Sequence, residues 1–485
     1  MSTLSAPPGG AVVRMYDPGG LGDCFLLAFP GPGGDDRPAR YVLVDCGVFN
    51  GTRGGSKQMR NVAADVVAVT GGRIDVLVLS HEHWDHLSGF QWARETFEND
   101  LQIDEVWAAW TEDPADPDAV RLQRELDADF GTLQLAASRL REARDPHLRA
   151  RADEIGGVLG FLGVGASKAA LRTLAAVPDR FAAKRSRGTA KQMDLALSLG
   201  DHARYLSPGE APVPVAPGVR AFVLGPPRNE ALLRRSDPRR HSGEVYEHAA
   251  AETARTRDGL ADALADDDPS APFGPDTGVP LGDASTGDLA DFVLDHYGGD
   301  EPPPELAWRR IDEDWLGTAE ALALQLDGDV NNTSLALAFE LADGRVLLFP
   351  GDAQVGNWLS WHELSWDDDG QLVTAETLLG QTVLYKVGHH ASHNATLRDL
   401  GLELMSHPDL TALVPVNEAQ ARKKKWAMPF APLDARLQER CSGRVLRADT
   451  KVPDRPAGVS QRTWQSFLGR VSTDPDGLWV QVEIE

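Results

Sequence analysis

The sequence predicts an α/β protein, a layered sandwich in which two β-sheets are covered by helices. Two observations predict this class. Short apolar segments of strand length alternate with helix-like segments along the 485 residues. They do so in two halves that are separated by a long middle part. Because apolar sheet faces must be covered by other elements, a layered arrangement follows.

The first hundred residues are predicted to be mainly strands. A turn with three glycines, PGGLGD at 18–23, separates the first two strands, since glycine permits a tight bend. A helix with one apolar face is expected at 59–70, and Gly71 and Gly72 end it. The run IDVLVLS is continuously apolar, as in a strand covered on both faces. Strands are predicted at 12–17, 24–29, 41–47, 74–80 and 103–110.

Two segments in the middle of the chain differ from the rest. Residues 116–200 carry Ala, Leu, Arg and Glu at helical spacing and are predicted to form a helical insertion. Residues 228–305 are rich in Asp, Gly, Pro and Ala and are predicted to form an acidic, partly flexible insertion. Further strands are predicted at 219–227, 333–341, 344–352, 382–390, 410–416, 443–449 and 478–484.

Composition points to a cytoplasmic protein. The three cysteines, Cys24, Cys46 and Cys441, lie in or beside apolar segments, which fits buried thiols in a reducing compartment better than a disulfide framework. No apolar run approaches the length of a membrane span, and the N-terminus lacks the basic and apolar parts of a signal peptide. We therefore expect no membrane association.

The net charge of −25 argues against tight, non-specific binding of nucleic acid, which depends on phosphate neutralisation. The charge is uneven, however. Residues 257–330 contain 19 acidic residues against three arginines and no lysine. The rest of the chain is only mildly acidic, so a nucleic-acid substrate is disfavoured but not excluded.

A dense group of titratable residues, SHEHWDHLSGF, follows the predicted strand at 74–80. Three of the 13 histidines fall within the six positions from His81 to His86. In an extended segment, His81 and His83 point the same way, and Asp85 and His86 follow where the chain turns into a helix. Imidazole and carboxylate ligands suit zinc and related divalent ions. The alternative is a polar surface loop with chance histidines.

A second group follows two later strands. Asp352 comes after one of them, and His389, His390 and His393 come after the next. Six of the 13 histidines therefore lie in two short clusters at strand ends. Taken alone, Asp352 fits a turn residue or a helix N-cap. Beside the other clusters it becomes a candidate carboxylate between two metal ions, which together with a shared water supply a nucleophile at neutral pH.

These motifs resemble those of a known family. HEHWDH matches the HxHxDH signature of the metallo-β-lactamase superfamily, and Asp45 in VLVDCG and Asp352 in FPGD follow that superfamily's motif order. DPGGLGD, NNTSL and YKVGHHAS resemble one branch, the soluble hydrolase domain of ComEC-type DNA-uptake proteins and its stand-alone relatives. The resemblance implies one metallo-β-lactamase-like domain, an αβ/βα four-layer sandwich over 11–485, with the segments 116–200 and 228–305 inserted within it.

The resemblance also implies a set of metal ligands. It assigns His81 and His83 to a first ion, places Asp352 as the bridge, and makes Asp45 the residue that holds a ligand histidine. Many relatives carry a third histidine on the first ion, where this chain has Asn331 and Asn332. We expect two divalent ions, zinc in the first place and manganese as the alternative. The second ion's implied ligands are Asp85, His86 and His390.

Other residues are candidates for catalysis or substrate binding. By resemblance, His389 stabilises charge in the transition state, and Asp85 is a further catalytic residue that orients the attacking water. Lys386 either contacts a substrate anion or is a lysine at a strand edge. Ser392 and Asn332 are further predicted substrate contacts.

A basic run, RKKKW at 422–426, either contacts a phosphodiester backbone or is a solvated loop. The basic run precedes AMPF at 427–430, where ComEC-like domains often carry a Gly-His-Pro, so Met428 replaces the histidine.

The leading hypothesis is a binuclear metal-dependent hydrolase of the phosphodiesterase or nuclease type. It acts on a phosphodiester, either single-stranded nucleic acid or a nucleotide-like molecule, through a metal-bound hydroxide. One alternative is a metallo-hydrolase of an amide, ester or lactam bond, which the missing third histidine disfavours. The other is a non-catalytic, metal-stabilised scaffold. The two insertions favour a protein partner in addition.

Overall fold

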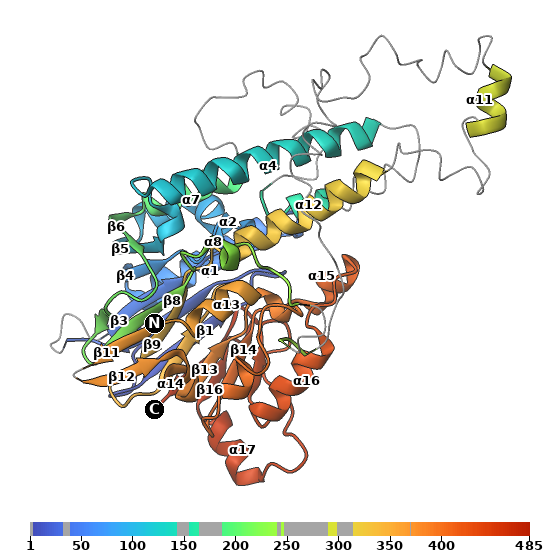
Figure 1. Ribbon diagram of the computed structural model, residues 1–485. Coiled ribbons are helices and arrows are strands. Elements are labelled where there is room, and N and C mark those ends of the chain that lie inside the picture. The colour runs from blue at the N-terminus through green and yellow to red at the C-terminus, as the bar shows by residue number, and fades with distance from the viewer. Residues whose placement is uncertain are drawn as a thin grey trace.

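The computed structural model describes residues 3–32, 39–142, 155–163, 187–239, 244–246, 290–297, 314–368 and 370–485. Their strands form an eight-stranded sheet, a seven-stranded sheet and a small two-stranded sheet. The two large sheets lie face to face, and helices cover the outer face of each (Figure 1).

The first sheet has the order β16-β17-β1-β2-β3-β4-β5-β6. Strands β3 to β6 run parallel to one another, and β1 and β2 pair antiparallel with their neighbours. The bounds are β1 Ala11–Tyr16, β2 Phe25–Pro30, β3 Ala39–Val44, β4 Arg73–Val78, β5 Gln102–Ala109, β6 Gly200–Leu206, β16 Val471–Thr473 and β17 Trp479–Ile484.

The second sheet has the order β15-β14-β13-β10-β9-β8-β7. Strands β10, β13, β14 and β15 are parallel, and β7, β8 and β9 pair antiparallel. The bounds are β7 Val213–Ala216, β8 Val219–Gly225, β9 Ala336–Glu340, β10 Val346–Phe349, β13 Thr382–Lys386, β14 Thr411–Val414 and β15 Val445–Arg447, with β11 Ser365–Asp368 and β12 Gln371–Thr374 in the small sheet.

Helices flank both sheets. Those packed with the first sheet are α1 Gly55–Thr70, α2 Trp84–Trp92, α3 Arg94–Asn99 and α7 Gly188–Leu197, and those packed with the second are α13 Val355–Trp361, α14 Ala375–Gly380, α15 Glu418–Lys423 and α16 Ala431–Arg440. Further helical elements are α4 Pro117–Glu142, α8 Glu230–Leu233, α11 Ala290–Tyr297, α12 Asp314–Asn331, α17 Gln461–Leu468, η1 Trp110–Glu112, η4 His389–Ala391 and η5 Leu402–Leu404.

The apolar core lies in layers. Alternate side chains of both sheets, such as Val13 and Leu337, meet between the sheets. There Phe25 and Phe349 pack edge to face with ring centroids 5.6 Å apart. Separate apolar clusters join each sheet to its helices. The predicted αβ/βα four-layer sandwich is therefore confirmed.

Most predicted strands of the two halves are present, and the predicted helix at 59–70 begins earlier, at Gly55. Short polar strands were missed. Four consecutive residues of β6, Asp201–Arg204, are all exposed, so its sequence lacks the apolar run that identifies a strand. Strands β7, β11, β12 and β16 are three or four residues long and were missed for a similar reason.

The predicted insertions differ in how far they can be described. Helices α4 and α7 lie in the segment 116–200, whose last residue already belongs to β6. The acidic segment 228–305 falls mostly outside the described residues, and its role as a partner surface stays a prediction. Among the described helices, none combines the length and the apolar character that crossing a bilayer requires.

Candidate metal centre

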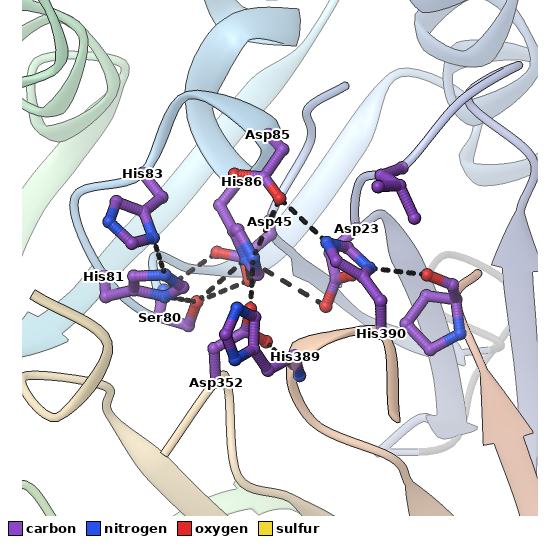
Figure 2. A network of polar contacts seen from close by, with 12 residues as sticks. Asp23, Asp45, Ser80, His81, His83, Asp85, His86, Asp352, His389 and His390 are labelled. Carbon is purple, nitrogen blue, oxygen red and sulfur yellow. Dashed lines mark hydrogen bonds and ion pairs between the residues drawn. The ribbon is translucent and has the colours of Figure 1, made fainter. Parts of the chain in front are cut away.

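The candidate site lies where four strands end. The loops after β3 and β4 of the first sheet carry Asp45 and the segment from His81 to His86. The loops after β10 and β13 of the second sheet carry Asp352 and the pair His389 and His390. Figure 2 shows that these side chains converge from both sheets on one region. The fold thus gathers into one place residues that are more than 300 positions apart.

The loop after β3 is docked tightly on the start of α2. Cys46 N–H donates to the His86 carbonyl at 2.8 Å, and Gly89 N–H donates to the Cys46 carbonyl at 2.8 Å. A Cβ atom at Gly47 would lie 2.4 Å from the Asp85 backbone, so only glycine permits this approach. This contact fixes the backbone that carries Asp85 and His86.

His81 and His83 face one another. The Nε2 of His81 is 3.0 Å from the Nδ1 of His83, and both side chains are buried. Burial lowers the pKa of His81 well below its ordinary value and that of His83 to about 4. Both rings are therefore neutral at neutral pH, which is the form that binds a metal ion.

His86 joins carboxylates from both sheets. Its Nδ1 is 2.8 Å from Asp45 Oδ2, and its Nε2 is 3.3 Å from Asp352 Oδ2. Asp45 also accepts hydrogen bonds from the backbone N–H and the hydroxyl of Ser80, at 2.8 and 2.6 Å. Burial lowers the pKa of His86, but Asp352, Asp23 and Asp45 outweigh it and raise that pKa well above its ordinary value.

His390 belongs to a strained turn. His389, His390 and Ala391 have φ values of 45°, 51° and 62°, which non-glycine residues rarely adopt. The turn holds His390 so that its Nε2 is 2.9 Å from Asp85 Oδ2 and its Nδ1 is 2.6 Å from the Pro415 carbonyl. Such strain at consecutive residues is typical of functional sites.

Asp352 is held by a buried lysine. Its Oδ1 accepts from Lys386 Nζ at 2.9 Å and from the His389 backbone N–H at 2.8 Å. The same ammonium lies 2.5 Å from Asp23 Oδ2 and 2.8 Å from the Gly351 carbonyl. Although burial opposes it, Lys386 lowers the pKa of Asp352 well below its ordinary value. The ammonium of Lys386 is thus engaged inside the protein, and its predicted contact with a substrate anion stays a prediction.

The other predicted substrate residues divide into two groups. Ser392 Oγ lies 2.9 Å from His389 Nδ1, so these two are brought together at the site. Asn332 is fully buried, its amide group donates to the Arg235 carbonyl at 2.9 Å, and its oxygen accepts from the Gln354 backbone N–H at 3.0 Å. Both polar groups of Asn332 are therefore bonded to the backbone. Of the second histidine group, His393 lies apart and is 3.7 Å from Asp237.

Sequence reasoning missed Asp23. Its carboxylate is buried 4.0 Å from His86 Nδ1 and 3.8 Å from His390 Nδ1, at the end of the β1–β2 turn. The signal was present, because Asp23 is the last residue of the DPGGLGD motif.

Sequence reasoning also missed a buried pair behind the His81–His86 loop. Arg187 donates to both carboxylate oxygens of Glu82, at 3.0 and 2.9 Å, and Thr189 donates to Glu82 at 2.8 Å. Glu82 and Arg187 are 3% and 0% exposed, so the charges compensate one another away from solvent. The sequence contains no local signal for a pair that is 105 positions apart.

The donor atoms fit divalent metal ions. Potential ligand atoms of His81, His86 and Asp352 all lie within 4.8 Å of one another, as do those of Asp23, Asp45 and His86. Within the described residues, Oδ1 of Asp85 is buried without a hydrogen-bond partner. Buried polar atoms are normally paired, and Asp85 lies next to His86, so an unpaired carboxylate oxygen beside these donor groups matches a cation site.

Comparison with known proteins agrees with the site. No curated protein matches the sequence. Residues 19–169 match the family model described as the metallo-beta-lactamase superfamily, a stretch that includes His81, His83, Asp85 and His86. The chain therefore has the metallo-β-lactamase fold and carries that superfamily's domain match over 19–169, with a candidate metal-binding cluster of histidines and aspartates at its centre.

Proposed function

We propose that this protein is a binuclear metal-dependent phosphodiesterase, related to the hydrolase domain of ComEC-type proteins. The observation that carries the proposal is that ligand atoms of His81, His86 and Asp352 lie within 4.8 Å of one another. In the proposal, His81 and His83 would hold one ion, Asp85, His86 and His390 would hold the other, and Asp352 would lie between them. Asp352 approaches His86 from the opposite sheet. Two divalent ions, when bound, supply a nucleophile at neutral pH and an electrophilic clamp on a substrate oxygen.

His389 is the proposed contact to the phosphoryl group. Asn394 donates to the Ser236 carbonyl at 3.1 Å, so its oxygen faces Ser392 and accepts that hydroxyl proton at 3.0 Å. Ser392 Oγ lies 2.9 Å and Gln354 Nε2 lies 3.4 Å from His389 Nδ1, so both contacts hold the ring through this nitrogen and the Nε2 atom is left for a ligand.

The charge of His389 follows from its surroundings. Burial lowers the pKa of His389 to about 4, so the ring is neutral without substrate. An anionic phosphodiester next to Nε2 favours the protonated ring. The imidazolium then donates to a non-bridging oxygen and stabilises the charge that develops during displacement.

A rim of aromatic and basic side chains supports a nucleic-acid substrate. Phe161 packs on His83, with ring centroids 5.7 Å apart, and stacks with the half-buried Trp426 at 5.1 Å. Lys424 is exposed, and its Nζ lies 5.1 Å from the Phe49 centroid and 6.0 Å from that of Trp426. Aromatic faces stack with bases, and lysines neutralise phosphates, so the rim suits single-stranded nucleic acid.

Hydrolysis of bis(p-nitrophenyl) phosphate by protein loaded with zinc or manganese tests the proposal. We expect metal-dependent release of p-nitrophenol that Asp352→Ala lowers more than about 100-fold, because even residues that only support metal ligands cost 10- to 100-fold. Labelled single-stranded DNA and RNA then identify the polymer. Absence of turnover with two ions bound would contradict the proposal and favour an amide, ester or lactam substrate.

A further inference from the structure

His83 differs from the other candidate histidine ligands in how its second ring nitrogen is bonded. The Nδ1 atoms of His81, His86 and His390 each face an oxygen, namely Ser80 Oγ at 3.0 Å, Asp45 Oδ2 at 2.8 Å and the Pro415 carbonyl at 2.6 Å. In His83, by contrast, the Nδ1 atom faces the Nε2 atom of His81, which is itself a candidate metal-binding atom. The Nε2 atom of His83 is buried and has no hydrogen-bond partner among the described residues.

The nearest carboxylate to this nitrogen comes from helix α12. Asp327 Oδ1 is 3.7 Å from His83 Nε2, and the two side chains are 15% and 2% exposed. Oδ1 of Asp327 is also a buried atom without a hydrogen-bond partner in the described part of the chain. Its other oxygen accepts from Asn331 Nδ2 at 3.2 Å, which orients the carboxylate. Two complementary, unpaired polar atoms thus lie just beyond hydrogen-bond distance.

We propose that Asp327 is the positioning residue of His83. Its carboxylate accepts a hydrogen bond from Nε2–H, which leaves the Nδ1 lone pair of His83 for the metal ion. A neutral imidazole carries one N–H, so an acceptor at Nε2 decides which nitrogen can bind metal. The inference rests on the metal centre of the proposed function and is independent of the substrate.

The surroundings of Asp327 support this role. Helix α12 is held in place by apolar packing with α4, to which Leu322, Leu326 and Val330 contribute.

The position of Asp327 also bears on the missing third histidine. Asn331 occupies the region where many relatives carry that ligand, and it donates to Asp327 at 3.2 Å. In this chain Asn331 therefore supports the first ion indirectly, because it orients Asp327, and Asp327 positions the ligand His83. We expect α12 to contribute to metal affinity although it contributes no metal ligand.

Zinc affinity of Asp327→Asn and Asp327→Ala tests the inference. Bound zinc is measured by mass spectrometry after equilibration with chelator-buffered zinc, and the visible spectrum of the cobalt-substituted protein reports the ligand geometry. We expect Asp327→Ala to weaken binding of one ion about 10- to 100-fold and to change the cobalt spectrum. Asp327→Asn, which keeps the size and one acceptor oxygen, should give a smaller loss.

Asp329→Asn is the matched control. Asp329 is a buried carboxylate of the same helix, and it pairs with Arg234 at 3.1 Å. We expect the control to lower the melting temperature of the metal-free protein without changing zinc affinity. The inference would be overturned if both Asp327 variants kept the wild-type zinc affinity and cobalt spectrum. It would also be overturned if Asp329→Asn lost as much zinc affinity as Asp327→Ala. A wild-type protein that binds no zinc would instead contradict the metal centre itself.

Discussion

The Nε2 atom of His86 lies 3.3 Å from the Oδ2 atom of Asp352, although 266 positions separate the two residues. His86 lies in the first turn of α2, which packs on the first sheet, and Asp352 follows β10 of the second. The contact therefore joins the two halves of the sandwich at the candidate metal centre. The donor group of His81, His86 and Asp352 therefore draws on both sheets.

Replacement of Asp45 tests how His86 is held. Asp45→Ala removes the oxygen that faces His86 Nδ1 at 2.8 Å, so the ring can rotate or change its tautomer. We expect zinc affinity to fall about 10- to 100-fold, as measured by competition with a chromogenic chelator. Asp75→Asn, at a buried aspartate that pairs with Arg40, is the control. Equal affinity in Asp45→Ala and the wild type would show that Asp45 does not support the ligand.

The pair formed by Glu82 and Arg187 is expected to stabilise the loop between His81 and His83. Arg187→Met leaves the buried Glu82 carboxylate without its main partner and should lower the free energy of unfolding by about 3–5 kcal/mol. Urea denaturation measures the change. The double variant Glu82→Gln with Arg187→Met removes both charges and should regain much of the loss. A double variant as unstable as the single one would indicate that packing, and not charge, is responsible.

The pKa of His389 predicts a pH dependence of stability in the metal-free protein. Burial lowers this pKa from 6.5 to about 4, so between these values the unfolded chain binds a proton that the folded chain does not. Stability therefore falls as pH falls from 6.5 to 4, by up to about 3 kcal/mol from this residue.

Denaturation of the wild type and of His389→Asn at pH 7 and pH 4, with a chelator present, isolates this contribution. The wild type should lose more stability than the variant over that interval. Parallel losses in the two proteins would place the pKa of His389 near its unfolded value.

Trp426 is expected to bind bases and not to take part in the chemistry. Trp426→Leu keeps an apolar contact with Phe161 but removes the stacking surface, which contributes about 1–3 kcal/mol per base. Affinity for a fluorescent single-stranded oligonucleotide should fall, whereas turnover of bis(p-nitrophenyl) phosphate should not. Trp479→Leu, at another half-buried tryptophan, is the control. If oligonucleotide affinity is unchanged in Trp426→Leu, the rim is not the nucleic-acid contact.

The sequence predicted the fold wherever its signals were local. Continuous apolar runs such as those of β4 and β13 identified strands covered on both faces, and their spacing indicated two sheets. Edge strands such as β6 have polar exposed residues and carry no such signal. The dense His81–His86 motif identified the candidate centre because its residues are adjacent in the chain.

The supporting residues could not be predicted in the same way. Arg187 and Asp327 reach the centre from the helical segment and from α12, and their partners are 105 and 244 positions away. Nothing in the local pattern around either residue distinguishes it from an ordinary charged residue of a helical segment. Their roles follow from burial and from unpaired or compensated charge, which only the three-dimensional structure provides.

The measurement that tests the central claim most directly is phosphodiesterase activity as a function of the number of metal ions bound. Metal-free protein is titrated with zinc or manganese, bound metal is counted at each point, and turnover of bis(p-nitrophenyl) phosphate is recorded. Asp352 is grouped with His81 and His86, and because we propose it as the carboxylate between two ions, we expect two ions per chain and turnover that rises mainly with the second. Full turnover with one ion bound, or none with two, would contradict a binuclear phosphodiesterase.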